Sequence, residues 1–206
     1  MNYENMDKKQ LIEILRDRES ILKKLYLEKE KLKYYASTDG MTGVLNRRVG
    51  LKLLNKEFSL SKSSNESIVV CFADVDKLKI INDKFGHKEG DRVLKFVAQT
   101  LKENIRKDDF VIRMGGDEFL IVFPRTTKRD IYYILNRIYK KIKEFNLKEY
   151  KYNLSLSYGF SEYKLNEAKD LTLNEVIHKA DKKMYKRKLK NKFLYEKRIK
   201  DKNPQV

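Results

Sequence analysis

This 206-residue sequence is poor in residues that cross-link or interrupt a chain, with one cysteine, two prolines, eight glycines and no tryptophan. Cys71 has no second cysteine to pair with, so an internal disulfide is excluded and a reducing compartment fits. No apolar run is long enough to span a membrane, and the N-terminus is too charged for a signal peptide. We therefore expect a soluble, cytoplasmic protein without a membrane segment.

Charge of one sign is in excess, because 47 Lys and Arg face 30 Asp and Glu, a net charge of +17. Such an excess is compatible with nucleic-acid binding. The lysines are spread along the chain, however, and no RNA-binding motif that mixes aromatic and basic residues is present. We expect no nucleic-acid partner, and keep a basic nucleic-acid-binding protein as the lowest-ranked alternative. Positive charge would still attract a nucleoside triphosphate.

Residues 7–36 predict one long helix, uninterrupted by proline or glycine. Its leucines follow a four-three alternation, and two charged residues interrupt this seam: Leu11, Leu15, Arg18, Leu22, Leu25, Lys29, Leu32 and Ala36. The stripe fits either an amphipathic helix packed on its own domain or a short parallel coiled coil. We favour the coiled coil, which would join a homodimer, because the stripe is narrow and its surroundings are strongly charged.

The remainder predicts a turn at 37–43 and then one α+β domain at 37–195, with a C-terminal tail at 196–206. The polar, serine-rich stretch 61–67 predicts a surface loop. The order of strands and helices gives a βαββαβ core, a central sheet with antiparallel strands flanked by helices. Helices are expected at about 47–60, 78–83, 88–105, 129–146 and 172–189, and strands at 68–74, 110–114, 119–123 and 152–159.

Two adjacent acids, Asp117 and Glu118, follow a Gly-Gly step between two apolar runs of strand length, 110–114 and 119–123. This pattern predicts a hairpin with both carboxylates at its tip. Clustered carboxylates are costly unless a cation neutralises them, and Mg²⁺ prefers carboxylate oxygens and substrate phosphates. The alternative is a solvated acidic turn.

A second acidic pair, Asp74 and Asp76, directly follows the apolar run 68–72, which is typical of a strand buried on both faces. Residues two apart in a strand point to the same side, so both carboxylates should do so. The end of a central strand is a usual place for metal ligands. A helix N-cap is the alternative; it fits Asp76 well but explains Asp74 less easily.

The stretch 72–91 reads FADVDKLKIINDKFGHKEGD, and it resembles the long motif of the GGDEF family of diguanylate cyclases, with Leu78 in place of the usual Phe. Three further stretches are similar to family motifs at the family's spacing: 39–48, 154–160 and 180–188. The resemblance covers about residues 37–193. It implies a fold like the palm of nucleotidyl cyclases and polymerases. It also implies a nucleotidyltransferase, a diguanylate cyclase that condenses two GTP into cyclic di-GMP and releases pyrophosphate.

The resemblance assigns metal binding to Asp74 and the Val75 carbonyl, with Asp117 at metal and proton acceptance and Glu118 as a further ligand. The implied cofactor is Mg²⁺, with Mn²⁺ as an alternative ion. Because Asp117 and Glu118 are neighbours on one hairpin, metal binding and proton acceptance can be shared between them. Lys79 would stabilise the transition state; the alternative for it is a solvated lysine.

The resemblance also implies a substrate site. Asn82 and Asp91 would read guanine, since an amide suits an acceptor edge and a carboxylate accepts from N1–H and N2–H₂. Leu78 is assigned to the same substrate site by its motif position. Lys188 would bind phosphate, whereas Lys192 stands where the family usually has Arg, after Asn191 in place of Gly. Lysine offers a point charge without the bidentate fork, so this second contact is weaker.

Arg106 and Asp109 precede the Gly-Gly step at the spacing of the family's inhibitory RxxD site, with Arg137 as a further contact. An arginine can grip the phosphates and stack on the guanine of cyclic di-GMP. We expect product inhibition there; an exposed ion pair at a helix end is the alternative.

One domain would hold one GTP, so the cyclic product needs two subunits that face each other. A coiled coil would raise the local concentration of the second half-site. The competing functional reading is a catalytically inactive GGDEF domain that binds GTP or cyclic di-GMP as a signalling receptor.

Overall fold

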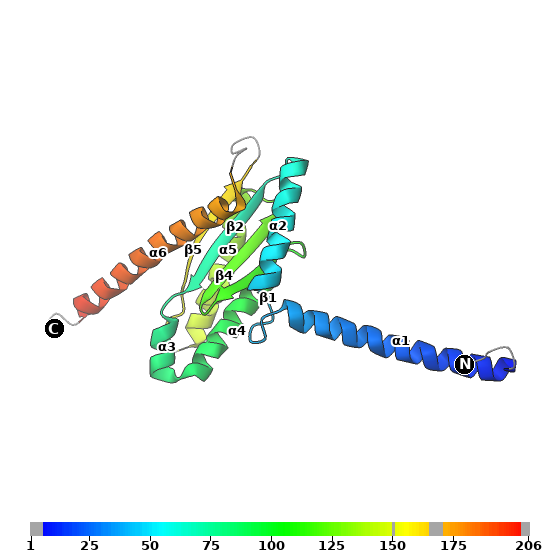
Figure 1. Cartoon of the computed structure of the whole chain (residues 1–206). Helices are drawn as coiled ribbons and strands as arrows, with labels where there is room; N and C mark the ends of the chain where they lie inside the picture. The colour runs from blue at the N-terminus through cyan, green and yellow to red at the C-terminus, as the bar shows by residue number, and fades with distance from the viewer. Residues whose placement is uncertain (1–5, 150, 165–170, 203–206) are drawn as a thin grey trace. The chain divides into compact units, whose positions relative to one another are not determined.

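The computed structural model describes residues 6–149, 151–164 and 171–202, with the backbone alone over 194–202. Two compact units are distinguished, residues 1–38 and 39–206. Figure 1 labels most elements of both units. In chain order they are α1 (Lys8–Ser37), β1 (Leu45–Asn46), α2 (Arg47–Ser64), β2 (Ile68–Val75), α3 (Leu78–Phe85), α4 (His87–Glu103), β3 (Phe110–Gly115), β4 (Glu118–Pro124), α5 (Lys128–Lys148), β5 (Leu156–Tyr163) and α6 (Leu173–Lys202).

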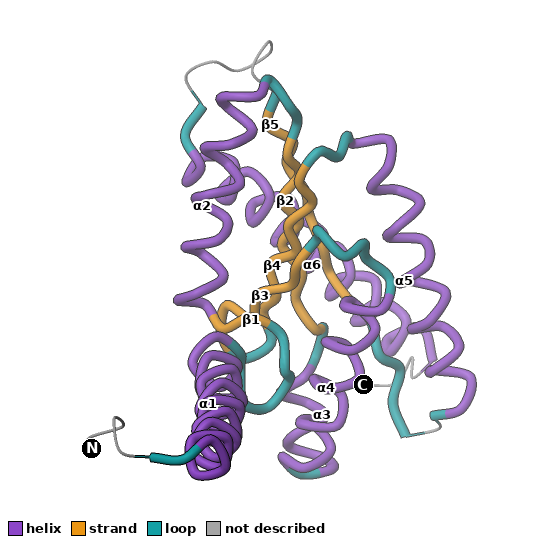
Figure 2. The backbone as a smooth tube through the Cα atoms, turned by 90° about the vertical axis from the view of Figure 1, so that its right-hand side faces the viewer, coloured by secondary structure: helices purple, strands orange, loops and turns teal. Residues whose placement is uncertain are grey.

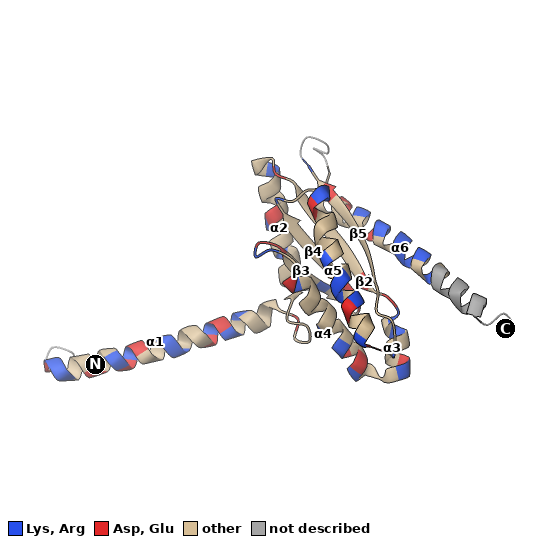
Figure 3. Cartoon of the chain, turned by 180° about the vertical axis from the view of Figure 1, so that it is seen from behind, with Lys and Arg blue, Asp and Glu red and all other residues tan. Residues whose placement is uncertain are grey.

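The first unit is a single helix, α1, which confirms the long N-terminal helix predicted from the leucine spacing. Asp7 starts it with a capping box, because its carboxylate accepts from the Gln10 backbone N–H while the Gln10 side chain accepts from that of Asp7. No residue of α1 is buried, and leucines such as Leu15 and Leu22 are exposed. Acidic and basic side chains alternate along its length (Figure 3).

The second unit is built on one five-stranded sheet in the order β1-β3-β4-β2-β5. Strand β2 lies between β4 and β5, antiparallel to both, and all eight of its residues are buried. The four longer strands with their helices form the predicted βαββαβ core, so the α+β fold class is confirmed. The short β1, which pairs in parallel with β3, was not predicted because two residues give no periodic signal.

Helices cover both faces of the sheet, and Figure 2 shows α2 and α5 on opposite sides of it. Alternation along β2 explains the two cores. Val69 and Cys71 pack with α3, α4 and α5, whereas Val70 and Phe72 pack with α2 and α6. Nearly continuous apolar sequence in β2 is therefore required, because neither face of that strand meets water.

The serine-rich stretch 61–67 was predicted as a loop, and this prediction is wrong over its first four residues, which belong to α2. Ser61 is buried, and the hydroxyls of Ser63 and Ser64 donate to the backbone carbonyl of Leu60 within the helix. The helix ends at Asn65, which adopts the left-handed conformation that closes many helices.

Strand β5 lies four residues later than predicted. The predicted start, 152–155, does not join the sheet because the Asn146 side chain takes both backbone groups of Leu154, at 2.8 Å each. Helix α6 is longer than predicted, since it continues to Lys202 and so enters the expected tail at 196–206. Residues 203–206 of that tail lie outside the described residues.

Helix α6 crosses β5 unusually closely at Gly159. A Cβ built there would lie 2.2 Å from the Met184 backbone N and 2.4 Å from the Ala180 carbonyl oxygen, so only glycine fits. This contact fixes the helix that brings Lys188 to the end of β2. Lys and Arg predominate along α6 (Figure 3). Among the described residues, no helix combines the length and apolarity needed to cross a bilayer.

Candidate active site

The two acidic pairs, distant in sequence, meet at one edge of the sheet. Asp74 in β2 is the direct partner of Glu118 in β4, and the Val75 backbone N–H donates to the Asp117 carbonyl at 3.0 Å. Directly opposed residues of an antiparallel pair place their side chains on the same face, with Cβ atoms about 5 Å apart. The strand ends therefore gather these acids, as the sequence predicted.

Asp74 is the most perturbed of these groups. Its side chain is only 3% exposed, and Oδ2 accepts from Lys188 Nζ at 2.6 Å. Its other oxygen, Oδ1, is buried and has no hydrogen-bond partner among the described residues. Burial raises the pKa of Asp74 to about 6, against the Lys188 hydrogen bond that lowers it, while the nearby Asp117 charge raises it further. A buried oxygen without a donor is a position where a cation would be stabilised.

Asp76 is not a helix N-cap, which corrects that reading of its position. Helix α3 begins after Lys77, a left-handed residue, and no side chain caps its first turn. Asp76 instead accepts from the Ser155 and Ser157 hydroxyls at 2.6 Å each. Asn191 on α6 donates to Asp76 and to Ser157, at 3.4 and 3.1 Å. Asp76 thus joins β2, β5 and α6 beneath the site. The partners of Asp76 are set by the pairing of β2 with β5, so the local sequence around Asp76 could not reveal them.

The acidic hairpin is a two-residue turn at Gly116-Asp117, and Glu118 is the first residue of β4. Arg113 fixes this turn, since its guanidinium donates to the Gly116 carbonyl at 2.8 Å and to Asp39 at 2.9 Å. Asp39 also accepts from the Thr42 backbone and hydroxyl, so the opening motif is a structural turn. Sequence reasoning missed Arg113, although its place just before the Gly-Gly step was a signal.

A cavity of about 370 Å³ adjoins Glu118 on the α2–α6 face of the sheet. Arg47 at the start of α2 lines it together with Met114 of β3 and His178 and Asp181 of α6. Arg47 thus lines the same cavity as Glu118, and it was not singled out from the sequence. Its signal was its place next to the helix-capping Asn46 in the opening motif.

The helices α3 and α4 present the residues assigned to guanine. Asn82 lies against Gly90 so closely that a Cβ at Gly90 would be 1.8 Å from Asn82 Oδ1. That oxygen is buried and has no hydrogen-bond partner among the described residues, as expected for a group that awaits a ligand donor. Asp91 is half-buried on α4, Lys79 is exposed in the first turn of α3, and Leu78 is buried in the core.

Helix α6 contributes the basic side. Burial alone would lower the pKa of Lys188, but its hydrogen bond to Asp74 and the charges of Asp74 and Asp117 raise it. Lys192, one turn further on, is exposed. Both lysines line an apolar cavity of about 920 Å³, together with residues of α5 and of the segment that leads into β5. Lys188 therefore reaches the acidic edge, while the structure shows no contact of Lys192 with it.

The residues of the RxxD pattern lie elsewhere. Asp109 precedes β3 at the end opposite the acidic hairpin, about 20 Å away along a six-residue strand. Its buried carboxylate accepts from the backbone N–H of Arg106 at 2.9 Å, which leaves the Arg106 side chain exposed. Arg137 on α5 donates to the Asn104 carbonyl at 2.6 Å and so lies beside the same turn.

The donor set at the strand ends fits Mg²⁺, although it does not form a closed cage. Within the ranges that the structure describes, no three His, Cys, Asp or Glu side chains converge as a ready-made metal cluster. Mg²⁺ is commonly held by one or two carboxylates with substrate phosphates completing its shell. Asp74 with its unpartnered oxygen, and Glu118 opposite it, are the carboxylates that would supply such ligands.

The domain is therefore a mixed sheet with acids at the ends of two adjacent strands, β2 and β4, and a lysine-bearing helix, α6, across them. A comparison with known families shows which class of domain this is. The family model described as "Diguanylate cyclase, GGDEF domain" matches residues 36–193. The chain belongs to the GGDEF family.

Named relatives and a solved structure agree with this assignment. The chain is 33% identical over 148 residues to the probable diguanylate cyclase DgcJ of Escherichia coli (strain K12), covering 72% of this chain and 28% of that protein. It is 31% identical over 180 residues to the diguanylate cyclase DgcP of Pseudomonas aeruginosa, covering 86% and 26%. The coiled coil and GGDEF domain of DgcB from Caulobacter crescentus, in complex with c-di-GMP, superimposes with a TM-score of 0.72 at 27% identity, covering 85% and 92%. The chain thus spans under a third of these two relatives' length.

Proposed function

We propose that this protein is a diguanylate cyclase that joins two GTP molecules into cyclic di-GMP. The observation that carries the proposal is the convergence of Asp74 and Glu118 at the end of adjacent strands, with Asp74 Oδ1 buried and unpartnered. In each of two steps a ribose 3′-oxygen forms a bond to the α-phosphorus of the other GTP. The bond from that phosphorus to the bridging oxygen of pyrophosphate breaks, and the 3′-hydroxyl proton is released. Two pyrophosphates leave per product.

Asp74, the Val75 carbonyl and Glu118 would hold Mg²⁺, with Asp117 beside them at the turn. The bound ion would polarise the attacking hydroxyl and neutralise the phosphates. Mn²⁺ would serve as an alternative, since it accepts the same oxygen ligands. Asp117, in the turn itself, would accept the hydroxyl proton, and the two neighbouring acids, Asp117 and Glu118, could share these roles.

Basic and amide side chains of this chain would bind the nucleotide. Lys79, exposed at the start of α3, and Lys188, which contacts Asp74 from α6, would stabilise phosphate charge. Lys188 would exchange its present bond to Asp74 for the triphosphate. Asn82, with its buried unpartnered oxygen, and Asp91 would select guanine. A cytoplasmic location suits an enzyme that consumes GTP.

We propose a homodimer joined through α1, because one domain supplies half of the reaction's two GTP sites. The support is the seam of exposed leucines on a helix that buries none of its own residues. The solved relative DgcB also combines a coiled coil with this domain. A Leu22→Lys and Leu25→Lys double variant should sediment as a monomer, and its activity at low protein concentration should fall steeply. A monomeric wild type, or full activity of the dilute variant, would contradict the proposal.

We propose that cyclic di-GMP also binds at Arg106, Asp109 and Arg137 and inhibits the enzyme. The support is the exposed Arg106 side chain on a turn whose backbone is held by the buried Asp109, with Arg137 alongside. The distance of this turn from the acidic hairpin makes it a separate site.

Product analysis by mass spectrometry after incubation with GTP and Mg²⁺ tests the proposed reaction. The wild-type protein should form cyclic di-GMP, Asp117→Ala should form none, and Glu144→Ala, which alters an exposed carboxylate of α5, should match the wild type. Binding of GTP or cyclic di-GMP without turnover would overturn the enzyme assignment in favour of a receptor.

A further inference from the structure

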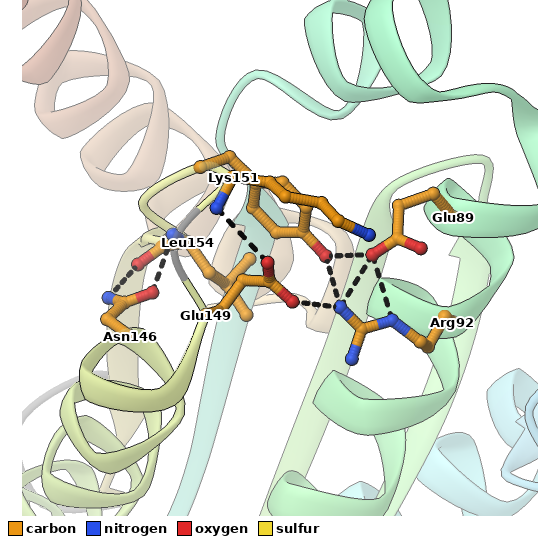
Figure 4. A network of polar contacts seen from close by, with 7 residues as sticks. Glu89, Arg92, Asn146, Glu149, Lys151 and Leu154 are labelled. Atoms are coloured by element: carbon orange, nitrogen blue, oxygen red, sulfur yellow. Dashed lines mark hydrogen bonds and ion pairs between the residues drawn. The ribbon is translucent and has the colours of Figure 1, made fainter.

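A cluster of polar and aromatic side chains joins the start of α4 to the segment between α5 and β5 (Figure 4). Arg92 is its centre. Its guanidinium donates to Glu89 on α4 at 2.6 and 2.8 Å, to the Tyr152 hydroxyl at 2.9 Å, and to Glu149. The Tyr152 hydroxyl in turn donates to Glu89 at 2.6 Å. Four side chains from two separate parts of the chain therefore share one closed hydrogen-bond network.

Aromatic rings extend this network to α3. The Tyr152 ring lies 5.6 Å from that of Phe85, the last residue of α3, and 6.4 Å from that of Phe145 on α5. Phe145 also stacks on Phe96 of α4 at 4.3 Å and lies under the Arg92 guanidinium at 5.3 Å. Tyr152 thus contacts the end of one helix with its ring and the start of the next with its hydroxyl.

The segment that carries Tyr152 is itself anchored. The Asn146 side chain donates to the Leu154 carbonyl and accepts from the Leu154 backbone N–H, as Figure 4 shows. The Lys151 backbone N–H donates to Glu149 at 3.2 Å. These bonds tie the backbone on both sides of Tyr152 to the end of α5, which packs on the sheet. The cluster is therefore a connection between the α3–α4 turn and a fixed part of the core.

The α3–α4 turn needs such a connection because its own ends are weakly held. Gly86 is both the C-cap of α3 and the N-cap of α4, with φ at 85°, and no side chain caps α4. Without a cap, the first turn of a helix loses a stabilising interaction and frays more easily. Asn82 and Asp91 flank this turn, four residues before it and five residues after it. Small movements of the turn would displace both residues that face the guanine.

We propose that Tyr152 and Arg92 are positioning residues that set the guanine specificity of the site without contacting the nucleotide. The inference rests on the proposed cyclase function and on its assignment of guanine to Asn82 and Asp91. Glu89 supports it electrostatically, because its hydrogen bonds from Arg92 and Tyr152 hold the pKa of that carboxyl below its usual range and keep the network charged.

Tyr152→Phe gives the sharpest test, since it removes the hydroxyl and keeps both ring contacts. We expect the KM for GTP to rise about three- to tenfold, as for the loss of one hydrogen bond between neutral groups, with kcat within about twofold. The KM for inosine triphosphate, which lacks the guanine 2-amino group, should rise less, so the preference for GTP should narrow. Arg92→Lys keeps the positive charge but loses the two-pronged guanidinium donor. It should also raise the KM for GTP and narrow the preference for GTP over inosine triphosphate.

Lys141→Ala is the matched control, because it removes an exposed ion pair on α5 that is not part of this hydrogen-bond network. It should leave all constants unchanged. Unchanged KM values in Tyr152→Phe and Arg92→Lys would overturn the inference, as would a parallel loss for both nucleotides together with a lowered melting temperature. A wild-type protein that makes no cyclic di-GMP from GTP would instead refute the underlying function, and the two failures are therefore distinguishable.

Discussion

Replacement of Gly90 by alanine should damage nucleotide binding and leave the fold intact. The new Cβ would lie 1.8 Å from Asn82 Oδ1 and 2.9 Å from its Cγ, where real Cβ contacts below 3.0 Å are essentially never found. The Asn82 amide must then move by about 1.2 Å or more, which is enough to break a hydrogen bond of ordinary length. The neighbouring atoms belong to a flexible side chain, so the backbone need not shift.

Gly90→Ala should change the KM for GTP much more than the free energy of unfolding. Loss of the proposed Asn82 hydrogen bond to guanine should cost about 1–2 kcal/mol of binding, a rise of about 5- to 30-fold in the KM for GTP. Alanine is favoured over glycine within a helix by about 1 kcal/mol. A displaced Asn82 rotamer costs a similar amount. The free energy of unfolding should therefore stay within about 1 kcal/mol of the wild-type value.

Steady-state release of pyrophosphate from GTP and urea denaturation together provide the assay. Gly40→Ala is the control, because no atom lies within 4 Å of a Cβ added there. Asn82→Ala should show the same KM defect, and Gly90→Ala should add nothing to it, because the shortened side chain leaves room for the methyl group. A wild-type KM in Gly90→Ala, or full additivity of the two substitutions, would refute the reasoning.

Three further predictions concern contacts elsewhere in the structure. Gly159→Ala should lower the free energy of unfolding by about 3 kcal/mol and the melting temperature by about 10 °C, since its Cβ would overlap backbone atoms of α6; a wild-type melting curve would disprove that close approach. Arg106→Ala should raise the cyclic di-GMP concentration needed for half-inhibition at least about tenfold, whereas Lys107→Ala should not, as measured by GTP turnover with added product. Glu89 has a lowered pKa in the folded state, so its stabilisation is present above the ordinary glutamate pKa and is lost as the pH falls through the folded value. Wild type and Glu89→Gln should therefore differ in stability at pH 7 and converge toward pH 3; a constant difference across that range would contradict this.

Local patterns in the sequence were sufficient for most of the fold and for the acidic residues of the site. The apolar run of β2 and the hairpin at Gly116 are short-range signals, and pairing of the two strands brings Asp74 opposite Glu118 without further information. The resemblance to the GGDEF family added Lys188, which contacts Asp74 from a helix more than a hundred residues away.

Features that depend on tertiary partners were not predictable in this way. The helical serines 61–64 have a loop-like composition, and only burial of Ser61 and packing of α2 decide their conformation. The start of β5 is set by the Asn146 amide, a contact between side chain and backbone with no periodic signature. Asp76 resembles an N-cap in sequence, yet its carboxylate accepts hydrogen bonds from Ser155, just before β5, and from Ser157 in β5.

A crystal structure grown with Mn²⁺ and a non-reactive GTP analogue would test the central claim most directly, through the anomalous signal of the metal. The account predicts a peak between β2 and β4, within coordinating distance of Asp74 Oδ1 and of a Glu118 carboxylate oxygen, with Lys188 released from Asp74. A metal held by phosphate alone, with Asp74 still paired to Lys188, would contradict it.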